Sequence, residues 1–218
     1  MLISRSEIVG LILSYAFVGI LFILSKYFSV LGLKREYNRK FLHIAISHWW
    51  LIAIVYFNRV SIAIIPPLTF IISNIIARDY KLLDAMERKP NHNQGLIYYP
   101  LAMTLLIIFS FGIIHEPYIG ALGLFTLAYG DGLAAVVGTT WGRHVIYLNK
   151  TLEGTIAMFV SSFIVILIIL TINNHSFVLL PTLCISTIAT LLEVFSPSGY
   201  DNLLIPLFTS LLYYFVFY

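Results

Sequence analysis

An aspartate stands among glycines at the polar end of an apolar segment. Gly130, Asp131 and Gly132 are followed by Gly138 and Gly142 at four-residue spacing. A carboxylate is costly in lipid unless it is paired or metal-bound, and glycine lets backbone N–H groups approach an anion closely. Small residues four apart also let membrane helices pack closely, which explains the last two glycines equally well but not the aspartate. The segment predicts a metal or phosphate site at Asp131, although its spacing is not that of a P-loop.

A second group of chemically capable residues precedes the next apolar segment. Thr151 is expected to cap the N-terminus of a helix, where free N–H groups and the helix dipole favour an anion. Lys150 beside it could pair with a phosphate, and Glu153 could hold Mg²⁺ or polarise a hydroxyl. The alternative is a solvated loop in which the acid complements the helix dipole.

A third group brackets a Ser-Pro-Ser-Gly turn. Glu193 ends one apolar run, and Asp201 and Asn202 begin the next. Carboxylate and amide oxygens are ligands that suit Mg²⁺, which takes few carboxylates together with waters and substrate phosphates. Asp201 could equally be a helix cap, whereas a carboxylate at the end of an apolar run is harder to explain without a function.

The fourth group is Arg39, Lys40 and His43, which share one face of a helix because they are three or four residues apart. Two cations and an imidazole at the point where a helix enters the membrane could bind phosphates, and arginine suits bidentate contacts with them. The two cations could instead anchor the helix among lipid headgroups. A histidine inside an apolar run more often serves a function.

The elements that must position these residues are membrane helices. The 218 residues are 60% hydrophobic and 11% charged, with a mean hydropathy of +0.93, which a water-soluble domain cannot bury. Apolar runs of about 18 residues or more predict spanning helices. Eight candidates cover residues 8–31, 41–57, 60–76, 96–114, 118–137, 155–171, 177–194 and 203–217. We therefore expect an all-α fold: one polytopic membrane helical bundle over residues 1–218, with seven to nine spans.

The positive charges indicate how the bundle is oriented. Of the 13 lysines and arginines, most cluster in three connections: Lys34, Arg35, Arg39 and Lys40; Arg78, Lys81, Arg88 and Lys89; Arg143 and Lys150. Positive charge stays cytoplasmic, so these connections and the acids beside them are expected at the cytoplasmic face of a prokaryotic cell membrane. The connection 78–95 is the longest polar one and is expected to act as a lid or to read a headgroup.

Taken together, the four groups resemble the polyprenol kinase family, which includes dolichol kinase, phytol kinase and the CTP-dependent diacylglycerol kinase of yeast and is distantly similar to CDP-diacylglycerol synthases. The quoted positions are Arg39-Lys40-x-x-His43, the Gly130-Asp131 segment with its spaced glycines, Lys150-Thr151-x-Glu153-Gly154, and Glu193 with Asp201-Asn202-Leu203. Gly95-x-x-Tyr98-Tyr99-Pro100 is similar to the phytol kinase branch. The chain lacks the extra N-terminal spans of dolichol kinases, so dolichol itself is not implied, and Thr151 stands where many relatives carry serine.

The resemblance implies an enzyme that moves the terminal phosphate of CTP onto a membrane lipid alcohol with Mg²⁺. Asp131, Glu193 and Asp201 are the expected metal ligands, and Asp131, Lys150, Glu153 and His43 the expected catalytic groups. The expected nucleotide-binding set is Arg39, Lys40, Gly130, Gly132, Gly138, Gly142, Thr151 and Asn202. In the expected mechanism, Lys150 and Arg39 neutralise charge on the transferring group, and Glu153 or His43 orients or deprotonates the lipid hydroxyl.

Two other functions are compatible with the sequence. A cytidylyltransferase making a CDP-lipid would use the same nucleotide, ion and membrane face, although the long Lys-Asp…His-Gly-Gly…Asp-Arg pattern of that class is missing. A small transporter with Asp131 and His43 as relay groups is disfavoured because there is no internal repeat and the polar groups crowd one face. The expected partners are the bilayer, a nucleoside triphosphate and a lipid alcohol, with no nucleic acid; the oligomeric state is not predicted.

Overall fold

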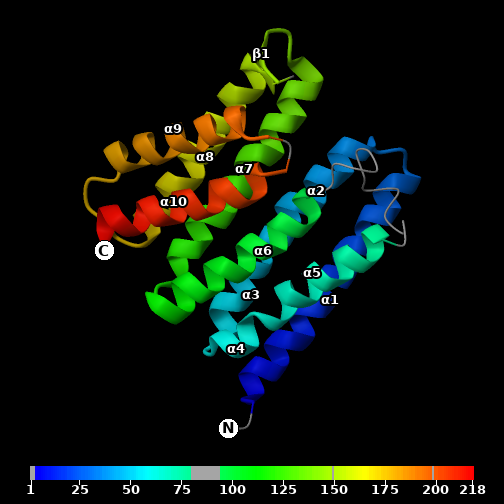
Figure 1. The fold of residues 1–218 in the computed structure, drawn as a ribbon, viewed down its shortest axis with the longest axis vertical. Helices are drawn as coiled ribbons and strands as arrows, with labels where there is room; N and C mark the ends of the chain where they lie inside the picture. Colours follow the sequence, from blue (N-terminus) through cyan, green and yellow to red (C-terminus); the bar gives the residue numbers. More distant parts are fainter. Residues whose placement is uncertain (1–2, 80–93, 149, 198) are drawn as a thin grey trace.

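The computed structural model describes residues 3–79, 94–148, 150–197 and 199–218, most of which are helical (Figure 1). The central part of the connection 78–95, the expected lid, lies outside the described residues. The same is true of the basic residues Lys81, Arg88 and Lys89.

The helices follow one another with short connections. In chain order they are α1 (Arg5–Val30), α2 (Arg35–Ser47), α3 (Trp49–Tyr56), α4 (Val60–Ala63), α5 (Ile65–Asp79), α6 (Gly95–Ile107), α7 (Pro117–Trp141), α8 (Leu152–Ile172), α9 (Leu179–Phe195) and α10 (Asp201–Phe217). A π-helical turn, η1 (Ile108–Ile113), extends α6.

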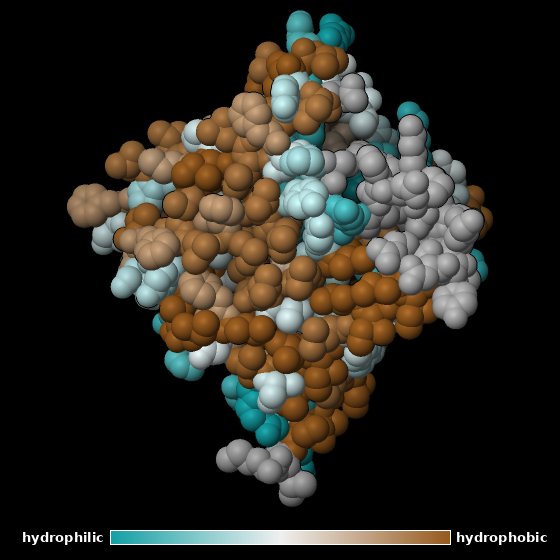
Figure 2. Space-filling view, in the orientation of Figure 1, coloured by the Kyte–Doolittle hydropathy of each residue, from teal (hydrophilic) through white to brown (hydrophobic). Residues whose placement is uncertain are grey.

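Within the described ranges, five helical stretches are long and apolar enough to cross a membrane. They are Arg5–Val30, Val60–Ala77, Gly95–Ile113, Pro117–Trp141 and Leu152–Ile172, with the shorter apolar helices Leu179–Phe195 and Asp201–Phe217 beside them. Apolar side chains cover most of the face drawn in Figure 2, and hydrophilic ones gather toward its upper and lower ends. The expected all-α polytopic membrane fold is confirmed.

Two of the eight expected runs contain a turn, although one of them lies within Val60–Ala77, which is still long and apolar enough to cross a membrane. The run 41–57 is divided between α2 and α3 at His48, whose N–H bonds to the carbonyl of Ala45, three residues earlier, at 3.1 Å. The run 60–76 is divided between α4 and α5 at Ile64. Pro66 and Pro67 follow that break, and neither has an N–H to continue the helical hydrogen bonds across it.

One element was not expected from the sequence. Residues Val145–Tyr147 (β1) and Lys150–Thr151 (β2) form a two-stranded antiparallel hairpin at the end of α7 (Figure 1). The hairpin leads into α8, and Thr151 caps that helix because its side chain accepts a hydrogen bond from the Gly154 N–H at 3.2 Å. The predicted N-cap is confirmed, and the hairpin fixes the position of Lys150.

Helix α7 lies at the centre of the bundle, in contact with α2, α6, α8 and α10. Its glycines allow this because a Cβ on Gly120 would collide with the Trp50 ring, and one on Gly123 with the backbone carbonyl of Pro206. Trp50 is fully buried and donates a hydrogen bond from its indole N–H to the carbonyl of Pro117 at 3.0 Å. Close packing therefore holds α7, which carries Asp131, in the middle of the molecule.

Candidate active site

One cavity of about 650 Å³ is lined by most of the site residues predicted from the sequence. Its polar lining residues include Arg39, Lys40, His43, Asp131, Lys150, Thr151, Glu193, Asp201 and Asn202. Its apolar lining residues include Val18, Phe22, Leu42, Ile46, Phe70, Leu96, Met103 and Ala134. Four separate segments of the chain thus contribute polar groups to one cavity, which continues into an apolar region.

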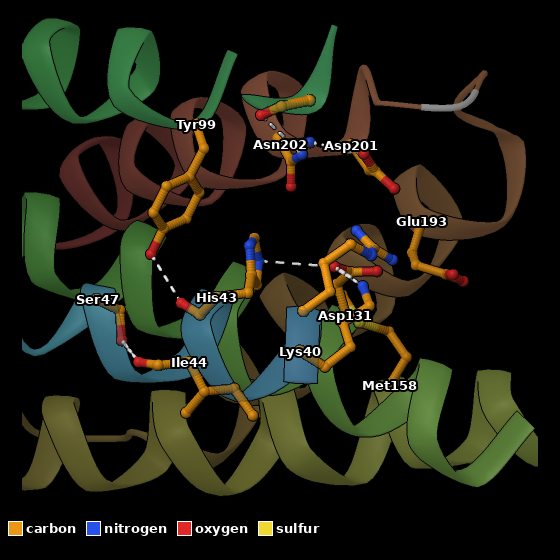
Figure 3. A network of polar contacts seen from close by, with 12 residues as sticks. Lys40, His43, Ile44, Ser47, Tyr99, Asp131, Met158, Glu193, Asp201 and Asn202 are labelled. Carbon is orange, nitrogen blue, oxygen red and sulfur yellow. Dashed lines mark hydrogen bonds and ion pairs between the residues drawn. The ribbon is translucent and has the colours of Figure 1, made fainter. Parts of the chain in front are cut away.

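Lys40 and Asp131 form a buried ion pair between α2 and α7, in which the lysine Nζ donates to the Oδ2 of the carboxylate (Figure 3). Lys40 is 2% exposed and Asp131 6% exposed. The two helices come close because Gly132 has no side chain: a Cβ there would lie 2.7 Å from Ile44. A charge this far from water is tolerated because its partner is beside it.

His43 lies on the same face of α2, with its Nε2 3.5 Å from Oδ2 of Asp131. Its ring packs on that of Tyr99, 4.6 Å between centroids, and the Tyr99 hydroxyl donates to the His43 backbone carbonyl at 3.1 Å (Figure 3). The buried Nε2 makes no hydrogen bond within the described part of the chain. The Nε2 atom therefore lies near a carboxylate without being engaged in a structural hydrogen bond.

Lys150 and Glu193 make a second ion pair, which joins the hairpin to α9. The Glu193 side chain is 4% exposed and that of Lys150 30%. Burial lowers the pKa of Lys150, but the carboxylates of Glu193, Asp131 and Asp201 outweigh it, so that its pKa lies above its ordinary value. Lys150 is therefore a stable cation that faces three carboxylates.

Asp201 and Asn202 open α10 on the opposite side of the cavity from His43 and Asp131 (Figure 3). The Asn202 Nδ2 donates to the carbonyl of Gly95 at 3.3 Å, and its buried Oδ1 has no partner among the described residues. A Cβ on Gly95 would lie 2.6 Å from the Asn202 amide. The junction of α6 with α10 thus holds an unpaired amide oxygen next to a carboxylate.

The glycines of α7 serve mainly to bring helices together. A Cβ on Gly130 would lie 2.6 Å from the sulfur of Met158, and one on Gly138 3.0 Å from the Thr151 hydroxyl. A Cβ on Gly142 would collide with the carbonyl of Gly138. Of the four predicted nucleotide-binding glycines, 130, 132, 138 and 142, Gly138 lines the cavity.

Two predicted site residues have their side chains engaged elsewhere. Glu153 accepts hydrogen bonds from the backbone N–H of Arg143 at 3.1 Å and from His144 Nδ1 at 2.7 Å, and it is not among the residues that line the cavity. Arg39 lines the cavity but forms a two-point contact with Glu36, at 2.6 and 3.1 Å. The structure therefore places Arg39 at the cavity and Glu153 at the base of the hairpin.

Several cavity residues carried no strong sequence signal. Tyr99, Gly95, Asn74 and Met103 line the cavity, and α6 contributes most of them. Among these residues, the sequence indicated only the Gly95-x-x-Tyr98-Tyr99-Pro100 segment, through its similarity to the phytol kinase branch. Their neighbours in space come from α1, α2, α5 and α10, so local patterns in the sequence could not reveal their role.

The carboxylates are not arranged as a ready-made metal site. No group of three or more histidine, cysteine, aspartate or glutamate side chains within the described ranges could hold a metal ion. Asp131 and Glu193 are each paired with a lysine, whereas Asp201 has no ion pair in the described part of the chain. Mg²⁺ needs only one or two carboxylates when phosphates complete its coordination. Asp201 and the unpaired oxygen of Asn202 fit that requirement.

Comparison with known proteins finds relatives among lipid kinases. A phytol kinase from Synechocystis sp. is 32% identical over 192 residues, which cover 81% of this chain and 78% of that protein. A dolichol kinase from Saccharomyces cerevisiae is 42% identical over 95 residues, 40% of this chain and 18% of that protein. An uncharacterized protein from Methanocaldococcus jannaschii is 28% identical over 85 residues, 39% of this chain and 42% of that protein. No protein-family model matches the chain, and no solved structure matches it.

Proposed function

The chain belongs to the polyprenol kinase family, and from that premise we propose that it transfers the terminal phosphoryl group of CTP to the hydroxyl of a membrane lipid alcohol. One observation carries the proposal: one cavity is lined both by three cations and three carboxylates, which we call its polar end, and by apolar side chains of α1, α2, α5 and α6, which we call its apolar end. A charged nucleotide and a lipid can meet only in a site with both characters. The lipid alcohol is of the phytol or polyprenol type, by analogy with the named relatives.

The donor triphosphate would bind at the polar end. Lys150 and Arg39 line it as cations that neutralise charge on the transferring group, which is most of what phosphoryl transfer asks of a protein. The helix dipole and free N–H groups at the start of α8 add to this attraction. Lys40 is oriented by Asp131 and lies close enough to the cavity to contact a phosphate when one binds.

The acceptor hydroxyl would lie between the two ends, near His43. In the reaction, the hydroxyl oxygen attacks the terminal phosphorus in line, the bond from that phosphorus to the bridging oxygen breaks, and CDP leaves. The hydroxyl proton passes to the Nε2 of His43, which has no hydrogen bond of its own in the described chain. Glu153, the other candidate for this role, is engaged with His144 at the base of the hairpin.

The residues present fit a magnesium ion bound together with the nucleotide. Asp201 and Asn202 would hold it, joined by Asp131 or Glu193 once phosphates engage the lysines that pair with these acids. When bound, the ion would neutralise charge on the triphosphate. The cation-rich end of the cavity, with Arg39, Lys40 and Lys150, is proposed to face the cytoplasm because positive charge is retained there and nucleotides are available.

The test follows the terminal phosphate of CTP. Purified protein in lipid is supplied with Mg²⁺, a panel of lipid alcohols and CTP labelled at the γ-phosphorus. Label in the lipid product supports the kinase, whereas label in pyrophosphate would mean cytidylyl transfer. Asp201→Asn is expected to lower the rate by about 100-fold or more. Glu116→Gln, which changes an acid outside the cavity, is the matched control and should keep the wild-type rate.

A further inference from the structure

One side of α8 carries a regular row of exposed apolar side chains. Six residues at four-residue spacing are each 44–60% exposed: Leu152, Ile156, Val160, Ile164, Ile168 and Ile172. Side chains four apart lie on one face of a helix, so this row faces away from the bundle, toward lipid. The polar residues 173–175 follow the row, and Lys150–Thr151 precede it. Polar segments therefore bound the row at both ends.

The length of the row indicates where the start of α8 lies in the bilayer. The 21 residues of this helix span about 30 Å at a rise of about 1.5 Å per residue. The hydrocarbon core of a bilayer is also about 30 Å thick. Leu152 therefore lies at one boundary of the core, and the segment that directly precedes it lies among the lipid headgroups.

That segment is the β1–β2 hairpin, whose first strand and turn expose apolar side chains. Four consecutive residues are each 46–70% exposed: Val145, Ile146, Tyr147 and Leu148. The N–H of Leu152 donates to the carbonyl of His144 at 2.8 Å, which joins the hairpin to the start of the exposed row. The hairpin lies at the upper end of the molecule (Figure 1), where apolar and hydrophilic side chains are mixed (Figure 2). The lipid-facing surface of α8 thus continues onto the hairpin.

The residue types of the hairpin are those of a membrane–water interface. Trp141, at the end of α7, is 64% exposed, and tryptophan and tyrosine are enriched at headgroup depth because each joins an apolar ring to a polar group. Arg143 is also exposed, and its side chain makes no ion pair in the described part of the chain. A guanidinium at this depth can bind lipid phosphates. A run of exposed apolar side chains would be unfavourable in water and marks a surface that something covers.

We propose that the β1–β2 hairpin, with Trp141 and Arg143, is a docking surface for the headgroup layer of the bilayer. Its apolar side chains reach the edge of the hydrocarbon core, and Arg143 contacts a lipid phosphate. Leu148 and Lys150 of the same hairpin line the cavity, so this part of the cavity wall lies at headgroup depth. A lipid alcohol keeps its hydroxyl at that depth too, because burying a hydroxyl in hydrocarbon is costly. The inference goes beyond the proposed function, and its test involves no catalysis.

Tryptophan fluorescence provides the test. Of the three tryptophans, Trp49 and Trp50 are 1% and 0% exposed, so Trp141 is the one that a quencher can reach. The protein is reconstituted in phosphatidylcholine vesicles with iodide on both sides, or with phosphatidylcholine that carries a nitroxide on its headgroup or near the end of its acyl chain. The emission lost in Trp141→Phe identifies the Trp141 signal. We expect the headgroup nitroxide to remove most of that signal, and iodide and the deep nitroxide to remove little.

Two further reporters, each placed in the Trp141→Phe protein, calibrate the depth. Val145→Trp puts the reporter on the hairpin itself and should show the same order of quenching as Trp141. Ile164→Trp puts it in the middle of the exposed row of α8 and is the matched control. Its emission should be quenched most by the deep nitroxide.

Each other outcome would overturn the inference. Quenching of Trp141 and Val145→Trp chiefly by iodide would show that the hairpin stands in water, and quenching chiefly by the deep nitroxide would place it inside the core. Insensitivity to all three quenchers would show that protein covers the hairpin, as in contact with a second copy of the chain.

A charged variant tests whether the apolar side chains hold the hairpin in the headgroup layer. Val145→Asp combined with Ile146→Asp should fold, because both positions are exposed, and should make the Trp141 signal more sensitive to iodide and less sensitive to the headgroup nitroxide. Val145→Thr combined with Ile146→Thr keeps β-forming residues without adding charge and is the control, which should shift less. An unchanged signal in the aspartate variant would contradict the docking surface.

Discussion

The side-chain amine of Lys40 on α2 contacts the carboxylate of Asp131 on α7 in the interior of the bundle. The two residues are 91 positions apart in the chain and both are almost completely buried. Such a pair is a weak source of stability because both charges lose their hydration, but breaking it leaves one charge uncompensated. A pair of this kind at a cavity wall is best understood as a group kept charged for a ligand.

The first prediction concerns Asp131→Asn. It removes the partner of a buried lysine and should destabilise the folded protein by about 3–5 kcal/mol, besides lowering the rate by about 100-fold or more. The double variant Lys40→Met with Asp131→Asn should recover most of the stability but none of the activity. Thermal unfolding in detergent and phosphoryl transfer per folded molecule measure the two effects separately.

The matched control for this experiment lies at the opposite end of the bundle. Glu7 is 1% exposed and forms an ion pair with Arg59. Glu7→Gln should also lower the unfolding temperature but keep the rate per folded molecule. A fully active Asp131→Asn would remove Asp131 from the site, however stable the variant proved to be.

A second prediction uses the charge on Lys150. Because its pKa is raised above the ordinary 10.5, the stability that its ion pairs contribute is fully present below pH 10.5 and is lost as the pH rises through the still higher folded value. The same holds for any rate that needs its charge. Glu193→Gln removes a carboxylate that raises this pKa, so the alkaline fall of kcat should move to lower pH.

The pH profile of kcat for the wild type, Glu193→Gln and the control Glu116→Gln provides the measurement. The position of the alkaline limb is the readout, since a purely structural role for Glu193 would scale the whole profile without moving it. An unmoved limb in Glu193→Gln would show that the two side chains are not coupled in the working enzyme.

A third prediction separates two roles for Glu153. A general base should lose about 100-fold or more in kcat when neutralised. The structure instead joins Glu153 to His144 and to the backbone N–H of Arg143, which ties the hairpin to α8. Glu153→Gln should therefore cost about tenfold or less, and His144→Ala about the same.

The double variant of these two positions tests the coupling. If both act through one contact, their effects on kcat should not add, because the second change removes nothing more. Additive losses, or a loss with Glu153→Gln as large as that with Asp131→Asn, would return Glu153 to the role of base.

Local patterns in the sequence predicted the helices better than they predicted the contacts between side chains of different helices. The apolar runs predicted the helices, and the threonine before an apolar run predicted the Thr151 cap. The hairpin was missed because strands of three and two residues are too short to show a periodicity. The surroundings of Glu153 depend on that hairpin, so they were hidden as well. The pairing of Lys40 with Asp131 joins distant segments, and only the packing of α2 on α7 makes it visible.

The last prediction concerns the packing that brings the lysine of the hairpin to the cavity. Gly154 at the start of α8 lies against α7, where a Cβ would stand 2.9 Å from the backbone carbonyl of Ala134 and 3.3 Å from the Cα of Gly138. Backbone cannot yield as a flexible side chain can, so Gly154→Ala should force α8 outward and destabilise the protein by about 1–3 kcal/mol. Because Thr151 and Lys150 directly precede this helix, KM for CTP should rise in the same variant.

Gly19→Ala on α1 is the matched control, since nothing lies within 4 Å of its Cβ position and alanine is the better helix former by about 1 kcal/mol. It should leave KM unchanged and keep or raise the unfolding temperature. Equal unfolding temperatures for the two variants would contradict the close approach of α7 and α8.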